Sequence, residues 1–187
     1  EAIETWQLVA QNYRAPVTPF QDFGVVATGN YAYCLLLALP FVHSEPLAKI
    51  AQSAHWNATL CESLLLQGLR ALATLHAAGC THGNINLETL LVDTTVPSDT
   101  RLLLDNPMPP HTLSREHHIP IRKPLNDLQD LAKAFTTFLK NSRSFDLWQK
   151  PLNVAALRWL QHYSRSVVKE PKETTLELYE TLSADLG

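Results

Sequence analysis

The sequence has little glycine and little cysteine for its 187 residues, and the two shortages exclude different kinds of site. Six glycines are present and no Gly-x-Gly-x-x-Gly string occurs, so no glycine-rich loop for binding phosphate groups is visible. The cysteines Cys34, Cys61 and Cys80 form no Cys-x-x-Cys pair, which argues against a zinc knuckle. Because their number is odd, a disulfide framework is also disfavoured. We therefore expect reduced thiols and a cytoplasmic setting.

A strong net charge and a long apolar run are missing as well. The formal net charge of -3 provides no global basic field, so composition gives no support for a nucleic-acid partner. The longest apolar run, residues 31–42, has about half of the roughly 20 residues that a membrane-spanning helix needs. No charged segment followed by an apolar one opens the chain. We expect no direct membrane insertion by this chain.

Apolar residues are plentiful: they make up 45% of the composition, which is enough for one substantial core. No internal repeat, low-complexity tract or long linker divides the sequence. We therefore predict a single domain over residues 1–187.

Local patterns predict a short helix and a β-hairpin, followed by a mainly helical region. Near-helical spacing of apolar residues over 3–13 indicates the helix, and aromatic and β-branched residues on both sides of Thr28-Gly29-Asn30 indicate the hairpin. A leucine-rich stripe over residues 60–78, ended by Gly79, predicts a long buried helix. Further along, we predict strands over residues 90–93 and 101–105, and helices over residues 125–139, 154–168 and 174–186.

The segment between the long helix and the first of these strands carries the most informative motif. It reads Leu75-His76-Ala77-Ala78-Gly79 and continues through His82-Gly83-Asn84 to Thr89. This string resembles the protein kinase catalytic loop, where a helix ending in Leu-His-x-x-Gly runs into His-Arg-Asp-x-x-x-x-Asn. In that family the Asp is the base and the Asn binds a metal ion. Here His82 is kept, Asn84 replaces the base and Thr89 replaces the metal-binding residue.

The order of the following elements extends the resemblance over nearly the whole chain. Asp105 ends the second strand, where a kinase has Asp-Phe-Gly. Asn126-Asp127-Leu128 resembles the opening of the kinase helix whose aspartate binds the catalytic-loop backbone. The resemblance therefore implies structural roles for Asp127 and for His82. Residues 170–178 are similar to the end of a kinase C-lobe, although the usual arginine is absent.

The resemblance implies an α+β fold, namely a mostly helical kinase-like C-lobe with a short β-hairpin remnant of the N-lobe. The remnant and the hinge would occupy residues 1–42, and the helical C-lobe residues 43–187. The strands that carry a kinase's phosphate loop and its Val-Ala-Ile-Lys lysine are not visible. Asp22-Phe23-Gly24 spells the magnesium-binding triplet, but it precedes the catalytic-loop segment and lies in a predicted strand, so we interpret it as coincidence.

Phosphoryl transfer needs a proton acceptor, a phosphate-binding lysine and Mg²⁺ held by carboxylate and amide oxygens. Asn84 cannot act as a base, Thr89 is a poor ligand, and Asp105 would be a lone magnesium carboxylate. We therefore predict no catalytic residue, no cofactor and no metal site, with His82, Asn84, Thr89 and Asp105 as degenerate positions.

We considered two further groups of residues, the histidines as metal ligands and the aromatic residues as a partner groove. His111, His117 and His118 invite a metal site, but the adjacent pair points apart unless the backbone bends, and no further ligand stands at zinc spacing. Trp148, Trp159 and Tyr163 have helical spacing and predict core packing, with a partner groove as the alternative.

These observations favour a catalytically inactive pseudokinase-like domain that binds proteins or acts as a scaffold in a signalling or secretion assembly. The resemblance includes pseudokinase domains of bacterial signalling and secretion proteins, which implies a membrane tether through a neighbouring segment as one context. Two alternatives stay open. One is a divergent nucleotide-binding kinase relative that uses Asp105 with Asp127 or Asp130. The other is an unrelated α+β adaptor.

Overall fold

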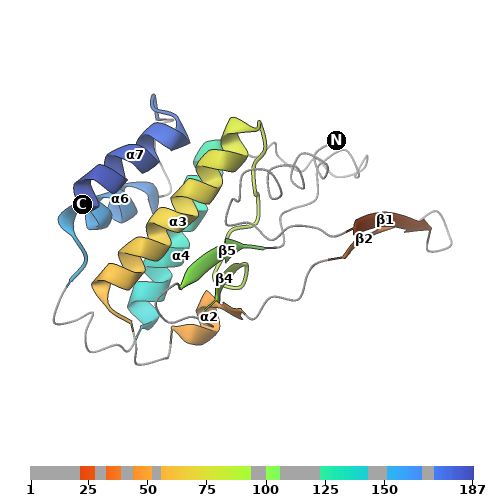
Figure 1. The fold of residues 1–187 in the computed structure, drawn as a ribbon, viewed down its shortest axis with the longest axis horizontal. Helices are drawn as coiled ribbons and strands as arrows, with labels where there is room; N and C mark the ends of the chain where they lie inside the picture. The colour runs from red at the N-terminus through yellow and green to blue at the C-terminus, as the bar shows by residue number, and fades with distance from the viewer. Residues whose placement is uncertain are drawn as a thin grey trace.

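The computed structural model describes residues 22–27, 33–38, 44–51, 56–93, 100–105, 123–142, 151–165 and 171–187. Within these ranges, the longer helices pack together on one side of a small antiparallel sheet, and one short helix lies against its strands (Figure 1). The helices are α2 (Leu47–Ile50), α3 (Ala58–Ala77), α4 (Pro124–Asn141), α6 (Val154–Tyr163) and α7 (Thr175–Leu186). The strands are β1 (Asp22–Ala27), β2 (Tyr33–Ala38), β3 (Glu45–Pro46), β4 (Leu90–Asp93) and β5 (Arg101–Leu104).

Helix α3 is the central element of the helical part. It begins after Asn57, whose side chain accepts a hydrogen bond from the Leu60 amide at 2.8 Å and so caps the first turn. Its apolar stripe is fully buried. The helix ends at Ala77, and Gly79, two residues later, has a φ of 75° in the left-handed region. The amides of Gly79 and Cys80 donate back to the carbonyls of His76 and Leu75, so the chain leaves the helix in a fixed direction.

Close packing holds α3 against α4 and the sheet. Gly68 lies midway along α3, and a Cβ atom there would meet the Leu102 and Leu131 side chains at 3.1 Å. The absent side chain therefore lets the elements approach. At the other end of the core, the rings of Trp56 and Phe138 meet edge to face with centroids 5.1 Å apart. Among the fully buried large side chains are Phe135, Phe138, Leu47, Leu64, Leu65, Leu69, Leu72, Leu75, Leu90, Leu102, Leu104 and Leu128.

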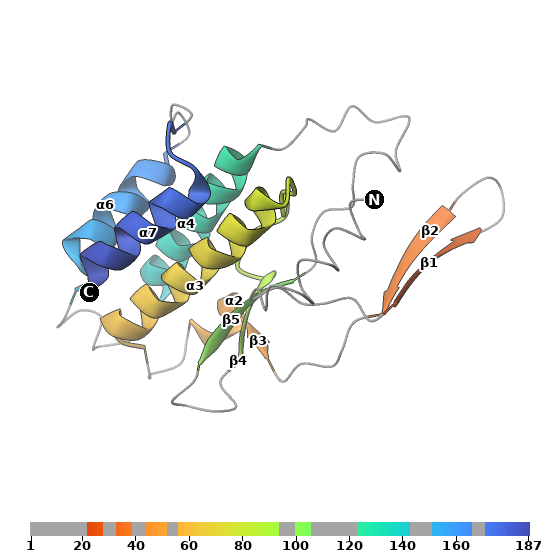
Figure 2. The same cartoon turned by 45° about the horizontal axis from the view of Figure 1, so that its top comes forward.

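The sheet that packs on α3 has the order β3-β4-β5. Leu90 pairs with Leu104 and Val92 with Leu102, and all four side chains are buried on the same face, as the two-residue period of a strand requires. Gln67 of α3 accepts a hydrogen bond from the Leu102 amide at 2.8 Å. A separate hairpin, β1-β2, stands away from the helices in both views (Figures 1 and 2).

The structure confirms the predicted α+β class with mostly helical content. The predicted strands 90–93 and 101–105 and the long helix agree with β4, β5 and α3 to within two residues. Strand β3 is an addition to the sequence prediction, and α6 ends at Tyr163 rather than at residue 168. The predicted helix over residues 3–13 lies outside the described residues. The domain limits 1–187, 1–42 and 43–187 stay predictions.

None of the helices in the described ranges has both the length and the apolar character needed to cross a membrane.

Candidate functional site

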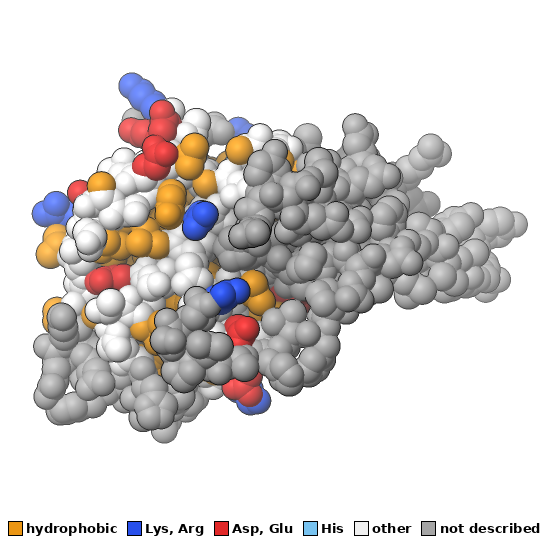
Figure 3. Space-filling view, in the orientation of Figure 1, with side chains coloured by type: hydrophobic (Ala, Val, Ile, Leu, Met, Phe, Trp, Pro, Cys, Tyr) orange, Lys and Arg blue, Asp and Glu red, His pale blue; other side chains and the backbone are white. Residues whose placement is uncertain are grey.

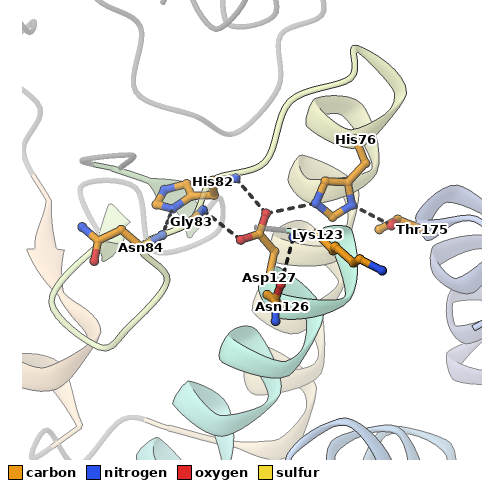
Figure 4. A network of polar contacts seen from close by, with 8 residues as sticks. All are labelled: His76, His82, Gly83, Asn84, Lys123, Asn126, Asp127 and Thr175. Carbon is orange, nitrogen blue, oxygen red and sulfur yellow. Dashed lines mark hydrogen bonds and ion pairs between the residues drawn. The ribbon is translucent and has the colours of Figure 1, made fainter. Parts of the chain in front are cut away.

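Asp127 occupies the centre of a buried polar network at the start of α4 (Figure 4). Its side chain has no exposed surface. One carboxylate oxygen accepts a hydrogen bond from the His82 amide at 2.7 Å, and the other accepts one from the Gly83 amide at 2.8 Å. The first turn of a helix also favours a negative charge. Asp127 therefore fixes the backbone of the loop that follows α3.

The same carboxylate is linked to the end of α3 and the start of α7. The Nε2 atom of His76 lies 3.1 Å from the Asp127 carboxylate, and the Nδ1 atom lies 2.7 Å from the Thr175 hydroxyl. With a neutral ring protonated on Nε2, His76 donates to Asp127 and accepts from Thr175. The chain His82–Asp127–His76–Thr175, which we call the anchor network, thus joins three helices to one loop (Figure 4).

His82 is fully buried and is held in its neutral form. Burial lowers its pKa from 6.5 to about 4, against opposing effects of the Asp127 carboxylate and of a hydrogen bond with the Asp105 backbone. Its Nδ1 atom accepts a hydrogen bond from the Asn84 amide at 3.2 Å, so the single ring proton is on Nε2. A buried, neutral ring of this kind packs the loop against the core.

The loop from Asn84 to Thr89 is closed by its own polar groups. The Thr89 hydroxyl donates to the Asn84 carbonyl at 2.6 Å and accepts from the Asn86 amide at 3.0 Å. The Asn86 carboxamide oxygen accepts from the Glu88 amide, and its nitrogen donates to the Asn84 side chain. Only 6% of Thr89 is exposed. Its hydroxyl is therefore directed into the loop.

Asp105 follows β5 and adjoins this loop. Its amide donates to the Thr89 carbonyl at 2.9 Å, which continues the pairing of β4 with β5 by one step. The carboxylate Oδ1 atom is buried and has no hydrogen-bond partner within the described part of the chain. Such an atom has a local demand for a donor or a cation.

The chemical capacity of this arrangement is narrow. Asn84 offers an amide at the position that the sequence resemblance matches to the kinase base, and an amide does not accept a proton at neutral pH. Both oxygens of Asp127 are occupied by loop amides, and Asp130 lies 3.6 Å from the Lys133 ammonium. Across the described ranges, no three His, Cys, Asp or Glu side chains come together as a metal site would require.

The structure brings together the five residues that the sequence resemblance assigned to the loop and its support, namely His82, Asn84, Thr89, Asp105 and Asp127. Their functional roles stay predictions.

Two members of the anchor network were missed. His76 belongs to the Leu-His-x-x-Gly string, so its position at the end of the long helix, next to the loop, could have identified it as a member of the network. Thr175 carried none, because its partner is 99 residues away in the sequence.

The other candidates divide between the core and the parts of the chain outside the described residues. Trp159 and Tyr163 are buried and lie with ring centroids 4.8 Å apart, which agrees with the predicted core packing. Cys61 and Cys80 are free, and burial raises the pKa of Cys61 to about 12, so its thiol is unreactive at neutral pH. His111, His117, His118 and Trp148 lie outside the described residues.

Comparison of the sequence with protein-family models finds no match, and a comparison with curated proteins finds none either. Solved structures do match. The PAN3 pseudokinase of Neurospora crassa superposes with a TM-score of 0.70 at 14% identity, over 99% of this chain and 48% of that one. The PknI kinase domain of Mycobacterium tuberculosis gives a TM-score of 0.62 at 14% identity, over 96% of this chain and 75% of that one.

A third match is the PAN3 pseudokinase of Drosophila melanogaster, with a TM-score of 0.59, 12% identity, and coverage of 100% of this chain and 52% of that one. The chain thus spans about half the length of the two PAN3 structures. These matches include both pseudokinases and a kinase domain, so the structural similarity indicates the fold and does not indicate whether the chain is active. The chain has a protein kinase-like fold, as its superposition on these structures shows.

Proposed function

We propose that this domain is a catalytically inactive, pseudokinase-like module that acts by binding protein partners, as an interaction or scaffolding unit. The observation that carries the proposal is the position of the Thr89 hydroxyl. Thr89 matches the position of the metal-binding Asn of a kinase. Its hydroxyl, however, donates a hydrogen bond to the Asn84 carbonyl at 2.6 Å, inside the loop. A group in that position is directed away from any ion above the loop.

Asn84 supports the same conclusion from the position of the base. Its side-chain oxygen accepts from the Asn86 carboxamide at 3.1 Å, and its amide donates to His82. These contacts stabilise the shape of the loop, whereas a general base needs a free lone pair with a matched pKa. The loop therefore has the shape of a kinase catalytic loop without the groups that transfer a phosphoryl group.

Protein binding is supported by what the fold retains. The buried core and the anchor network maintain a rigid helical surface, and rigid surfaces bind with a small loss of conformational freedom. In the described part of the chain, Leu176 and Val154 are the large hydrophobic residues left exposed, at 49% and 60%. We take Leu176 of α7 and Val154 of α6 as candidate contact points for a partner on this surface.

The proposal is tested by measuring phosphoryl transfer and nucleotide binding together. Purified protein with γ-labelled ATP and Mg²⁺ or Mn²⁺ should label neither itself nor a generic substrate, and ATP with either metal should leave the melting temperature unchanged. A kinase domain with an intact catalytic loop serves as the positive control. Label transfer that is lost in an Asp105→Asn variant would contradict the proposal.

A second function, nucleotide binding without catalysis, is favoured by one observation. The unpartnered Oδ1 atom of Asp105 is the kind of buried oxygen that a magnesium-nucleotide complex would satisfy. A rise of several degrees in melting temperature with ATP and Mg²⁺, abolished by Asp105→Asn, would establish this function. Asp185→Asn is the matched control, because Asp185 is exposed near the end of α7 and belongs to no proposed nucleotide site.

A further inference from the structure

A pocket of about 400 Å³ lies where the end of α3, the first turn of α4 and the start of α7 meet. Its size is within the range of ligand-binding cavities, at roughly 300 to 1,000 Å³. Apolar side chains form most of its walls. They come from Ala73 and Ala77 of α3, Pro124, Leu125 and Leu128 of α4, and Pro171 and Leu176 beside or within α7.

Apart from Glu173, the polar side chains that line the pocket already have hydrogen-bond partners within the protein. His76 uses Nε2 on Asp127 and Nδ1 on the Thr175 hydroxyl. The Thr174 hydroxyl accepts a hydrogen bond from the Glu177 amide, and the Glu177 carboxylate accepts one from the Thr174 amide at 2.6 Å. An occupant would thus gain little by hydrogen bonding to these groups. Recognition in this pocket must come from apolar contact.

Charge distinguishes between apolar occupants. Among the lining residues, the one with a formal charge is the exposed Glu173, and Leu176 stands beside it with 49% of its surface accessible. Acidic side chains gather at the start of α7, with a basic side chain beside them and hydrophobic side chains next to them (Figure 3). The exposed Lys172 precedes Glu173 in the chain, but it does not line the pocket, whereas Glu173 does. A carboxylate at the rim attracts a cation and repels an anion. The chemistry therefore favours an apolar group with a positive charge close by.

We propose that this pocket holds an apolar side chain of a partner protein, with a lysine or arginine of that partner placed against Glu173. The site rests on the proposed function, because it is one contact point of an interaction module. The pocket floor contains His76, which the anchor network holds in place, so the cavity exists before the partner arrives. Pre-formed cavities bind apolar anchors with a low cost of ordering.

Short capped peptides are the probes that test the site. Each is titrated into ¹⁵N-labelled protein and followed by amide chemical shifts. Ac-Phe-Lys-NH₂ should shift the amides of Ala77 and Leu176 with a millimolar dissociation constant, as expected of so small a ligand. Ac-Phe-Glu-NH₂ should bind about fivefold more weakly because of Glu173. Ac-Ala-Lys-NH₂, which lacks the anchor, should give no saturable shift.

Variants separate the pocket from the general surface. Ala77 is exposed on the pocket wall, so Ala77→Leu fills the cavity without burying a new group in the core, and it should weaken Ac-Phe-Lys-NH₂ by about tenfold. Glu173→Lys should reverse the preference between the lysine and glutamate peptides. Val154→Ser, which removes the exposed hydrophobic residue of α6, is the matched control and should change nothing. Circular dichroism verifies that each variant is folded.

Other occupants are outcomes that would overturn the proposal. Decanoate binding as tightly as Ac-Phe-Lys-NH₂ would assign the pocket to an acyl chain. Shifts at Ala77 and Leu176 that grow with protein concentration alone would assign it to a second copy of this chain. Equal binding of the lysine and glutamate peptides would remove the role of Glu173. If no peptide binds and no label is transferred from ATP, the pocket proposal is wrong but the inactive module remains supported. If label is transferred from ATP, the inactive module is wrong, whether or not the peptides bind.

Discussion

The loop of residues 82–89 and the anchor network beneath it differ in what they share with a kinase catalytic loop. In the loop, the sequence resemblance matches Asn84 to the base and Thr89 to the metal ligand, but the Thr89 hydroxyl donates to the Asn84 carbonyl and the Asn84 amide donates to the His82 ring. In the anchor network, Asp127 still receives the amides of His82 and Gly83. The comparison teaches that the shape of the loop and its chemistry depend on different residues. The first can therefore persist without the second.

Removal of the Asp127 carboxylate should have the largest effect on stability. Asp127→Ala leaves two loop amides and the His76 ring without their shared acceptor, so we expect a loss of about 3 to 5 kcal/mol in the free energy of unfolding, measured by urea denaturation. Asp130→Ala, on the same helix, should cost less than about 1 kcal/mol. Similar losses for the two variants would mean that Asp127 does not hold the loop.

Acid should weaken the anchor through His82. Its pKa in the folded protein, about 4, lies below its unfolded value of 6.5, so the unfolded chain binds the proton more readily. The stability from the neutral ring is complete above pH 6.5 and is lost as the pH falls towards 4, by about 3 kcal/mol in total. Urea denaturation of the wild type and His82→Gln between pH 7.5 and 4.5 measures it. The two pH profiles should converge as the pH falls, and parallel profiles would refute the assignment.

Substitutions within the loop should cost less stability than the loss of Asp127. Thr89→Val keeps the side-chain shape but removes the donor to the Asn84 carbonyl and the acceptor for the Asn86 amide, so we expect a loss of about 1 to 2 kcal/mol. Thr89→Ser retains the hydroxyl and is the control. A loss in Thr89→Val as large as that of Asp127→Ala would end the distinction between loop and anchor.

The smallest effect should come from the far end of the network. Thr175→Val removes the partner of the His76 Nδ1 atom, and we expect a loss of about 1 kcal/mol with no change in the ATP experiments. Thr175→Ser should restore the stability of the wild type. If thermal denaturation finds Thr175→Val and Thr175→Ser equally unstable, the hydroxyl contact is not what joins α7 to the loop.

Much of this arrangement was accessible from the sequence because its signals are local. The stripe of leucines and Gly79 predicted α3 and its end, and the string from His76 to Asn84 predicted a loop of the kinase type. Asp127 could be matched because it opens a helix with a recognisable pattern.

The remainder depends on contacts between distant segments. Strand β3 has two residues, and it exists because Glu45 pairs with Val92, a contact that no local pattern encodes. Thr175 looks like any residue of a first helical turn until its distance to His76 is known. The inward hydroxyl of Thr89 depends on the path of the loop, which residue types alone do not determine.

The 99 residues that separate His76 from Thr175 have a consequence for the order of folding. During synthesis the loop and α3 are made well before Asp127, and Asp127 well before Thr175, and contacts of such sequence separation form late. The loop therefore obtains its acceptor only when α4 docks, and His76 its last partner only when α7 docks. A ribosome-bound chain halted before α4 should therefore have a loop that exchanges its amide hydrogens faster than that of a chain halted after α4.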